Sequence, residues 1–218
     1  MFTRDQFEDA CEAFARRHPQ WSWVSGHHPG YGFLTRVTIH TCKAPLDLEA
    51  DASDLEEEEV EVGEEDSAIA KPSSLSTLNV KEYIAYSASF NVPAFYFTMH
   101  DRSRWCDVCL FLGSYLSLDG TPLPLHEILQ TSLFKMRPPS GSEATDFALT
   151  LPSGSFPLIS QGEHPTLGTP CWFFHPCESE TAVNEFMMDE DRSDWSQERR
   201  YVRWLEIWLM IVGSIFDV

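Results

Sequence analysis

The amino-acid sequence predicts an α+β domain built on a mostly antiparallel sheet. The chain opens and closes with helical patterns, and strand-like segments with one further helical pattern lie between them. That order is typical of folds in which helices gather on one face or end of an antiparallel sheet. With 218 residues, 43% of them hydrophobic, the chain can fill one sizeable core. We therefore expect residues 1–218 to form a single domain.

The first element is a helix that begins after Thr3 and ends near Pro19. Thr3 and Gln6 have the spacing of a capping box, in which each side chain bonds the backbone amide of the other residue. The apolar residues of this helix share one face, which is expected to be buried: Phe7, Ala10, Cys11 and Phe14.

Strand composition predicts the sheet. The candidate strands are Phe33–Cys42, Glu82–Ser89, Val92–Met99, a strand or hairpin at Trp105–Leu118, and Pro170–His175. The second and third of these are expected to flank a turn at Phe90-Asn91. Their exposed edges, around Tyr86–Phe97, could pair with a strand of a partner protein.

Helical spacing recurs at Pro124–Met136 and again at Trp195–Phe216. The stripe of Trp204 and Trp208 in the last helix is more typical of a core than of an interface. Residues 138–160 are rich in Pro, Ser and Gly and are expected to form a loop.

The charge of the chain is concentrated in one segment. Lys and Arg total 15 against 34 Asp and Glu, and eleven of these acids lie between Glu49 and Asp66. Such a segment buries too little apolar area to offset its ordering entropy, so we expect a disordered acidic insertion at about 46–76. The acidic balance argues against general nucleic-acid binding and against a polybasic membrane anchor, because both need clustered cations.

The six cysteines indicate free thiols in a reducing compartment. The sequence starts with a polar helical pattern and not with a signal peptide, so a cytoplasmic protein is expected. The longest apolar run, Ile207–Phe216, is too short to span a bilayer.

A zinc site and a serine hydrolase are both disfavoured. Cys106 and Cys109 have ligand spacing, but Cys171 and His175 lie on a strand-like segment, two side-chain periods apart, too far for one tetrahedral ion. No G-x-S-x-G elbow is present. We therefore expect neither a metal nor a cofactor.

A cysteine nucleophile is the remaining candidate. Cys177 follows Pro176, and proline cannot continue a sheet ladder, so the chain leaves the sheet there. The thiol of Cys177 can therefore be exposed while its backbone is held.

Residues 163–187, EHPTLGTPCWFFHPCESETAVNEFM, resemble the active-site stretch of the autophagy ubiquitin-conjugating-like enzymes, whose His-Pro-Cys carries the thioester cysteine. Tyr86–Phe97, Asp119–Gln130 and the closing helix are similar to the same family. The resemblance implies a ubiquitin-conjugating-enzyme-like fold, in which an antiparallel sheet is flanked by N- and C-terminal helices.

The resemblance also implies a reaction. Cys177 would accept the ubiquitin-like modifier autophagy-related protein twelve from its activating enzyme, autophagy-related protein seven, which uses the ATP. The modifier would then pass to a lysine of autophagy-related protein five. His175 would support the reaction by donating to the oxyanion or by orienting the lysine. Either Tyr86 or Tyr96 would contribute a hydroxyl, and Asn184 lies in the matched stretch.

Two other functions stay open at this point. One is a conjugating enzyme that transfers a modifier to a lipid amine. The other is a catalytically inactive autophagy adaptor that binds the same partners and forms no thioester.

Overall fold

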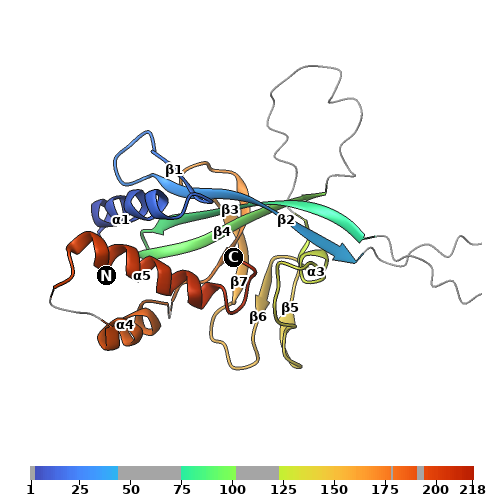
Figure 1. The fold of residues 1–218 in the computed structure, drawn as a ribbon. Helices are drawn as coiled ribbons and strands as arrows, with labels where there is room; N and C mark the ends of the chain where they lie inside the picture. The colour runs from blue at the N-terminus through green and yellow to red at the C-terminus, as the bar shows by residue number, and fades with distance from the viewer. Residues whose placement is uncertain (1–2, 44–74, 102–122, 178, 191–193) are drawn as a thin grey trace, which may run out of the picture.

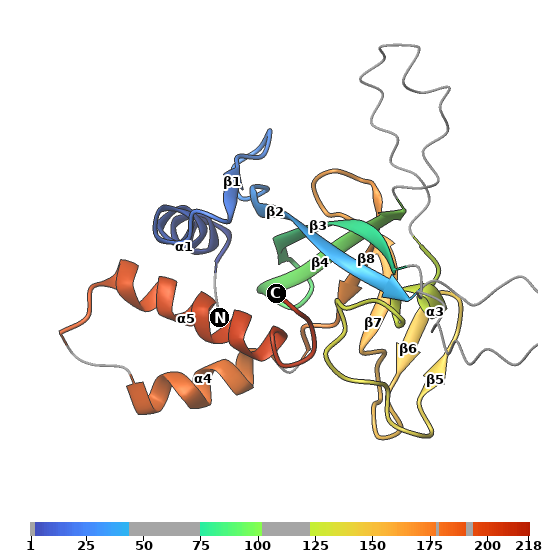
Figure 2. The ribbon, with the colours of Figure 1, turned by 45° about the vertical axis from the view of Figure 1, so that its right-hand side comes forward.

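The computed structural model describes residues 3–43, 75–101, 123–177, 179–190 and 194–218. Within these ranges it contains one eight-stranded sheet in the order β1-β2-β3-β4-β8-β7-β6-β5, with every neighbouring pair antiparallel (Figure 1). Helices α1 and α5 lie side by side across one face of the sheet (Figure 2). The α+β prediction, with helices at both ends of the chain, is confirmed.

The strands are β1 (Ser22–Val24), β2 (Phe33–Lys43), β3 (Leu75–Ser87), β4 (Val92–Asp101), β5 (Glu143–Ala144), β6 (Ala148–Thr150), β7 (Ile159–Glu163) and β8 (Pro170–Phe174). The helices are α1 (Arg4–Arg17), α3 (Leu125–Ile128), α4 (Ser179–Glu190) and α5 (Gln197–Val212).

Helix α1 begins where its caps predict. The Gln6 amide donates to Thr3 Oγ1 at 3.2 Å, and the Thr3 amide donates to Gln6 Oε1 at 2.9 Å. Phe7 and Phe14 on its apolar face are buried against the sheet and α5. Local capping and a matching apolar stripe therefore agree on both the start and the orientation of this helix.

Strand β3 begins earlier than the sequence predicts. It pairs with β2 from Leu75 onward, so the expected acidic insertion at about 46–76 overlaps the strand at its end. The rest of that insertion lies outside the described residues, as does the strand or hairpin expected at residues 105–118.

The prediction of exposed strand edges around Tyr86–Phe97 is wrong. Strand β3 lies between β2 and β4, and β4 lies between β3 and β8. Tyr96 and Phe97 form the two β4–β8 pairs, so the end of this segment lies in the middle of the sheet. Its high apolar content reflects burial on both faces, which period-two patterning alone cannot separate from an edge.

The helix expected at Pro124–Met136 is only one turn long, from Leu125 to Ile128. The backbone beyond it pairs with distant strands and loops instead of with itself. The Ser132 amide donates to Thr41 O at 2.8 Å, and the Lys135 amide donates to Ile215 O at 2.9 Å. These tertiary hydrogen bonds outweigh a helical pattern of modest length.

The loop expected at 138–160 contains three strands or parts of them, β5, β6 and the start of β7. Leu149 and Ile159 pair across β6 and β7, and both are buried in the main hydrophobic core. Burial of these two side chains overrides the turn-like composition around them. Helix α4 was also absent from our prediction, although Val183 and Met187, four residues apart, both pack on the core.

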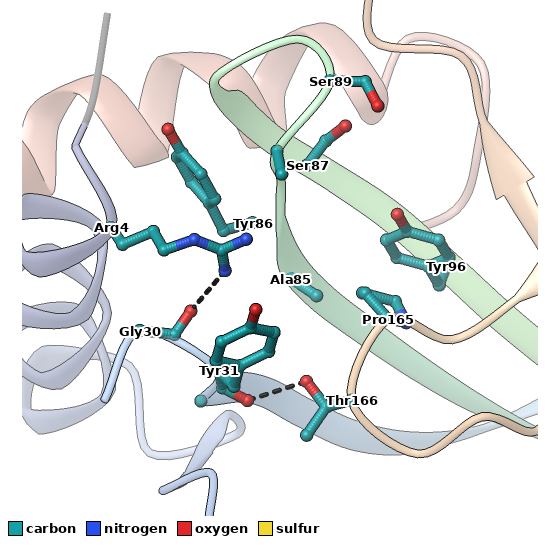
Figure 3. Close-up of a pocket in the computed structure, with 12 residues that line it drawn as sticks. Arg4, Gly30, Tyr31, Ala85, Tyr86, Ser87, Ser89, Tyr96, Pro165 and Thr166 are labelled. Carbon is teal, nitrogen blue, oxygen red and sulfur yellow. Dashed lines mark hydrogen bonds between the residues drawn. The ribbon is translucent and has the colours of Figure 1, made fainter. Parts of the chain in front are cut away.

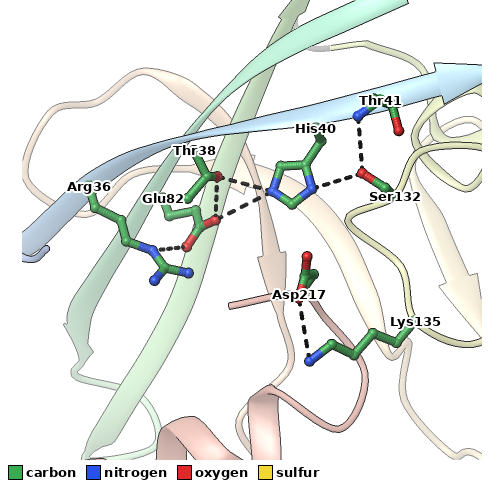
Figure 4. Close-up of polar contacts among 8 residues, drawn as sticks. All are labelled: Arg36, Thr38, His40, Thr41, Glu82, Ser132, Lys135 and Asp217. Atoms are coloured by element: carbon green, nitrogen blue, oxygen red, sulfur yellow. Dashed lines mark hydrogen bonds and ion pairs between the residues drawn. The ribbon is translucent and has the colours of Figure 1, made fainter. Parts of the chain in front are cut away.

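A cluster of polar side chains is buried on the helix-covered face of the sheet (Figure 4). Glu82 is fully buried, and its two oxygens accept from Arg36 Nε and Thr38 Oγ1, each at 2.7 Å. Because Thr38 Oγ1 donates to Glu82, it must accept from His40 Nε2, 3.1 Å away. His40 Nδ1 shares a second hydrogen bond with Ser132 Oγ at 3.2 Å. The chain of bonds joins β2, β3 and the segment after α3.

Candidate active site

The candidate nucleophile, Cys177, has an exposed side chain, whereas Cys11, Cys42 and Cys171 are buried. It lies on the turn between β8 and α4. Ser179 holds that turn, since both its amide and its hydroxyl donate to Pro176 O, at 3.1 and 2.8 Å. The prediction of an exposed thiol on a fixed backbone is confirmed.

Strand β8 fixes the position at which the chain leaves the sheet. Trp172 is fully buried in its middle and donates from Nε1 to Leu123 O at 3.0 Å. At its end, the His175 amide donates to Leu158 O at 2.9 Å. Cys177 is therefore two residues beyond a backbone that β4, β7 and the loop before β7 hold in place.

His175 lies among phenylalanine rings. Its imidazole stacks on Phe156, with ring centroids 5.3 Å apart and an interplanar angle of 10°, and meets Phe90 edge-on at 4.9 Å. Its Nδ1 atom is buried without a hydrogen-bond partner among the described residues. Burial lowers the pKa of His175 from its ordinary value, so the ring is neutral near pH 7.

The two candidate tyrosines lie on opposite faces of the sheet. Tyr86 packs in the core beneath the helices, against Phe7, and its hydroxyl donates to Asn91 Oδ1 at 3.0 Å. Tyr96 belongs to a smaller cluster on the other face with Phe173, whose ring lies 6.4 Å from that of His175. Tyr96 is therefore the tyrosine that shares a face of the sheet with His175.

The hydroxyl of Tyr96 is a hydrogen-bond donor with no hydrogen bond to another described residue. Burial, with a contribution from Cys171, raises the pKa of Tyr96 to about 12, so the group stays protonated at physiological pH. Its ring lines a cavity of about 220 Å³ near the end of the β3–β4 hairpin.

This cavity has both polar and apolar lining, and it is bounded by α1, the loop before β2, the hairpin and the β7–β8 loop (Figure 3). The Arg4 guanidinium lies over the rings of Tyr31 and Tyr86, at 4.4 and 5.1 Å, and donates to Gly30 O. Ser89 lines the same cavity, directly before Phe90 in the hairpin turn. The cavity therefore adjoins the turn that contacts His175.

Residues 6–218 match the family model described as autophagocytosis associated protein, active-site domain. The chain belongs to this family. Three relatives are each named ubiquitin-like-conjugating enzyme ATG10. The protein from Dictyostelium discoideum is 28% identical over 62% of this chain and 49% of its own length. The human protein is 26% identical over 96% of this chain and 86% of its own. The Arabidopsis thaliana protein is 28% identical over 96% of this chain and 85% of its own length.

The residues of the His-Pro-Cys stretch and its neighbourhood differ in their surroundings. Asn184, in the same stretch, accepts a hydrogen bond from Trp204 Nε1 at 3.3 Å and so links α4 to α5. Trp204 and Trp208 are buried, as the core interpretation of the last helix predicts. Phe90 and Phe156 were not predicted as site residues, because only the fold brings them to His175.

Of the four cysteine and histidine residues weighed as zinc ligands, Cys106 and Cys109 lie outside the described residues. Cys171 is buried in the cluster around Tyr96, and burial together with Glu163 raises the pKa of its thiol to about 12. Across the described ranges, no three His, Cys, Asp or Glu side chains are grouped to hold a metal ion. None of the described helices is long and apolar enough to cross a membrane.

His164, earlier in the motif stretch, shapes the turn between β7 and β8. Its Nδ1 accepts from the amides of Thr166 and Leu167, both at 3.2 Å. Its carbonyl accepts from Gly168 N, and Gly168 adopts a φ of 65° that favours glycine. The ring is almost completely buried, and burial lowers its pKa to about 4.

We expect His164 to make the fold sensitive to acid. Unfolded, its imidazole takes up a proton below about pH 6.5, whereas in the folded protein it does so only near pH 4. The unfolded state therefore binds more protons in that window, and stability falls as the pH drops through it, by on the order of 3 kcal/mol. Urea denaturation of the wild type and of His164→Asn at pH 7, 5.5 and 4 measures this loss. The side-chain oxygen of the variant can still accept hydrogen bonds from the two turn amides. The variant should therefore lose less stability than the wild type as the pH falls. An equal loss of unfolding free energy with falling pH in the two proteins would show that His164 is not the source of the acid sensitivity.

Proposed function

We propose that this protein carries the ubiquitin-like modifier autophagy-related protein twelve as a thioester on Cys177 and transfers it to a lysine of autophagy-related protein five. The observation that carries the proposal is the exposed Cys177 thiol on a rigid turn, within the matched active-site domain. The names of the relatives support the same reaction class. We infer a cytoplasmic site of action, as expected for a pathway that starts with ATP-dependent activation.

The reaction has two acyl transfers. First, the Cys177 thiolate attacks the thioester carbonyl of the modifier on the activating enzyme, and the sulfur of that enzyme leaves. Then the amine of the acceptor lysine attacks the carbonyl of the Cys177 thioester. The C–N bond forms, the C–S bond breaks, and its electron pair returns to Cys177. The amine loses one proton in this step, so a nearby base assists it.

We propose Tyr96 as the hydroxyl group that serves the reaction, in preference to Tyr86. A protonated phenol can donate a hydrogen bond to the oxyanion that develops on the thioester carbonyl. Tyr86 is already bonded to Asn91 and packed on Phe7. Tyr96 shares its face of the sheet with Phe173, whose ring lies next to that of His175.

Tyr96→Phe is expected to slow transfer of the modifier from Cys177 by about tenfold to a hundredfold, because one donor to the oxyanion is lost. The formation of the thioester and the thermal stability should change much less, since the ring and its packing remain. Single-turnover discharge measured on gels gives the rate. Tyr86→Phe is the matched control and should discharge at nearly the wild-type rate. The reverse ranking of the two variants would assign the role to Tyr86.

A reconstituted charging assay tests the function as a whole. The purified protein is mixed with autophagy-related protein seven, the modifier and ATP, and the products are resolved with and without reductant. Next, autophagy-related protein five or vesicles containing phosphatidylethanolamine are added to the charged protein. We expect a reductant-sensitive adduct that is consumed only by the protein acceptor. Consumption by the vesicles would identify a lipid-conjugating enzyme, and binding to the acceptor without any adduct would identify an adaptor.

A further inference from the structure

The aromatic residues around His175 form a site that the proposed function leaves unexplained. Phe90 lies in the turn of the β3–β4 hairpin, and Phe156 lies in the loop before β7. Both contact the imidazole, yet their side chains remain 37% and 60% exposed. Two exposed rings thus flank a neutral imidazole two residues away from the nucleophile. The two phenylalanine rings make the border of this surface apolar, and the His175 imidazole between them can accept a proton.

We propose that Phe90 and Phe156 bind the alkyl chain of the incoming acceptor lysine and deliver its amine to His175, which accepts the amine proton. This inference rests on the proposed function, since it specifies how the second acyl transfer occurs. Phe90 and Phe156 are positioning residues, and His175 is the group that receives the proton.

The chemistry of the two substrates favours the lysine as the occupant. The thioester is formed by a C-terminal glycine, which has no side chain to pack on an aromatic ring. A lysine has four methylene groups that can pack on the two rings. The segments that carry the rings, residues 88–91 and 152–158, contain no titratable side chain. An amine in these surroundings loses its charge more readily than in water, and only the neutral amine is a nucleophile.

The state of His175 fits a base and not a cationic donor. Its pKa is lowered by burial, and the titratable residues that follow it in the sequence are Cys177, Glu178 and Glu180. Its buried Nδ1 has no partner in the described part of the chain, so Nε2 is the atom that can meet the amine. As the C–N bond forms, Nε2 takes the proton from nitrogen, the C–S electron pair returns to Cys177, and the imidazolium later releases its proton to water.

The test measures how the charged protein reacts with two amines. The protein is charged with the modifier, the activating enzyme is then stopped by removing Mg²⁺-ATP, and free L-lysine or hydroxylamine is added across a pH series. We expect Phe156→Ala to lower the rate with lysine by about tenfold, while charging and the reaction with hydroxylamine stay within about twofold. Hydroxylamine has no alkyl chain for the rings to hold.

The pH profile provides a readout that a purely structural role would not move. Removing the Phe156 ring exposes the imidazole, so the pKa of His175 should rise toward its ordinary value. The acidic limb of the pH–rate profile for lysine should then shift to higher pH in Phe156→Ala. The limb of Phe156→Leu should lie between those of Phe156→Ala and the wild type. Phe147→Ala is the matched control, because that phenylalanine is 66% exposed in the neighbouring β5–β6 turn.

Several outcomes would overturn the inference. Slower charging in Phe156→Ala would mean that the rings hold the modifier. An equal loss with hydroxylamine, or no loss with either amine, would exclude a role in binding the lysine. Thermal denaturation verifies that the variants are folded, and Phe90→Ala repeats the comparison from the second ring. A wild type that forms no thioester would overturn the proposed function as well, whereas a normal wild type with an unaltered variant would overturn this inference alone.

Discussion

Cys177→Ala is expected to form no adduct with the modifier, and Cys177→Ser is expected to accumulate an adduct that reductant does not cleave. Alanine removes the only atom that can hold the acyl group at this position. Serine can hold it as an oxygen ester, which is a poorer acyl donor than a thioester because an alkoxide leaves less readily than a thiolate. Both variants change one exposed side chain, so the fold should be unaffected.

The charging assay, run with each variant and resolved with and without reductant, measures this effect. Cys11→Ala is the matched control, because it removes a buried cysteine from the face of α1 that packs on the core. That variant should charge like the wild type. A reductant-sensitive band that survives in Cys177→Ala would show that another cysteine carries the modifier.

The second large effect concerns stability. Glu82→Gln is expected to lower the free energy of unfolding by about 3–5 kcal/mol, the range for breaking a buried ion pair on one side. The Arg36 guanidinium, whose side chain is only 13% exposed, would lose its counter-ion. The neutral amide also cannot accept from both Arg36 and Thr38 with the two oxygens that a carboxylate offers.

Chemical denaturation at pH 7 gives this free energy directly. Glu198→Gln is the matched control, since Glu198 is 53% exposed and lies 3.5 and 3.6 Å from Arg16 and Arg17. An exposed pair of this kind contributes about 0–1 kcal/mol. A loss in Glu82→Gln as small as in the control would show that the buried network contributes little to the fold.

The parts of the fold that sequence predicts well are those determined locally. Helix α1 follows from its own capping box and stripe, and the central strands follow from composition. The single-turn α3 and the strands β5 to β7 could not be predicted, because distant backbone groups such as Thr41 O and Ile215 O decide them. A helix-forming pattern cannot show that its amides find partners elsewhere.

The candidate site divides in the same way. The position of Cys177 after an apolar strand and a proline is a local property, and the exposed thiol was predicted from it. The choice between Tyr86 and Tyr96 depends on which face of the sheet each occupies, and this requires the register of β3 and β4. Phe90 and Phe156 are 66 residues apart in the sequence, so only the folded chain brings both of them to the His175 imidazole.

The eleven paired positions between β2 and β3 run from Phe33 with Ala85 to Lys43 with Leu75. This ladder holds both ends of the connection at residues 44–74 at one place, at the far end from the β3–β4 turn. A change in the length of that connection does not shift the register of any strand or move Phe90. In evolutionary terms it is a permissive position, where a lineage can gain or lose an acidic segment while the half of the sheet that leads to Cys177 stays under its own selection.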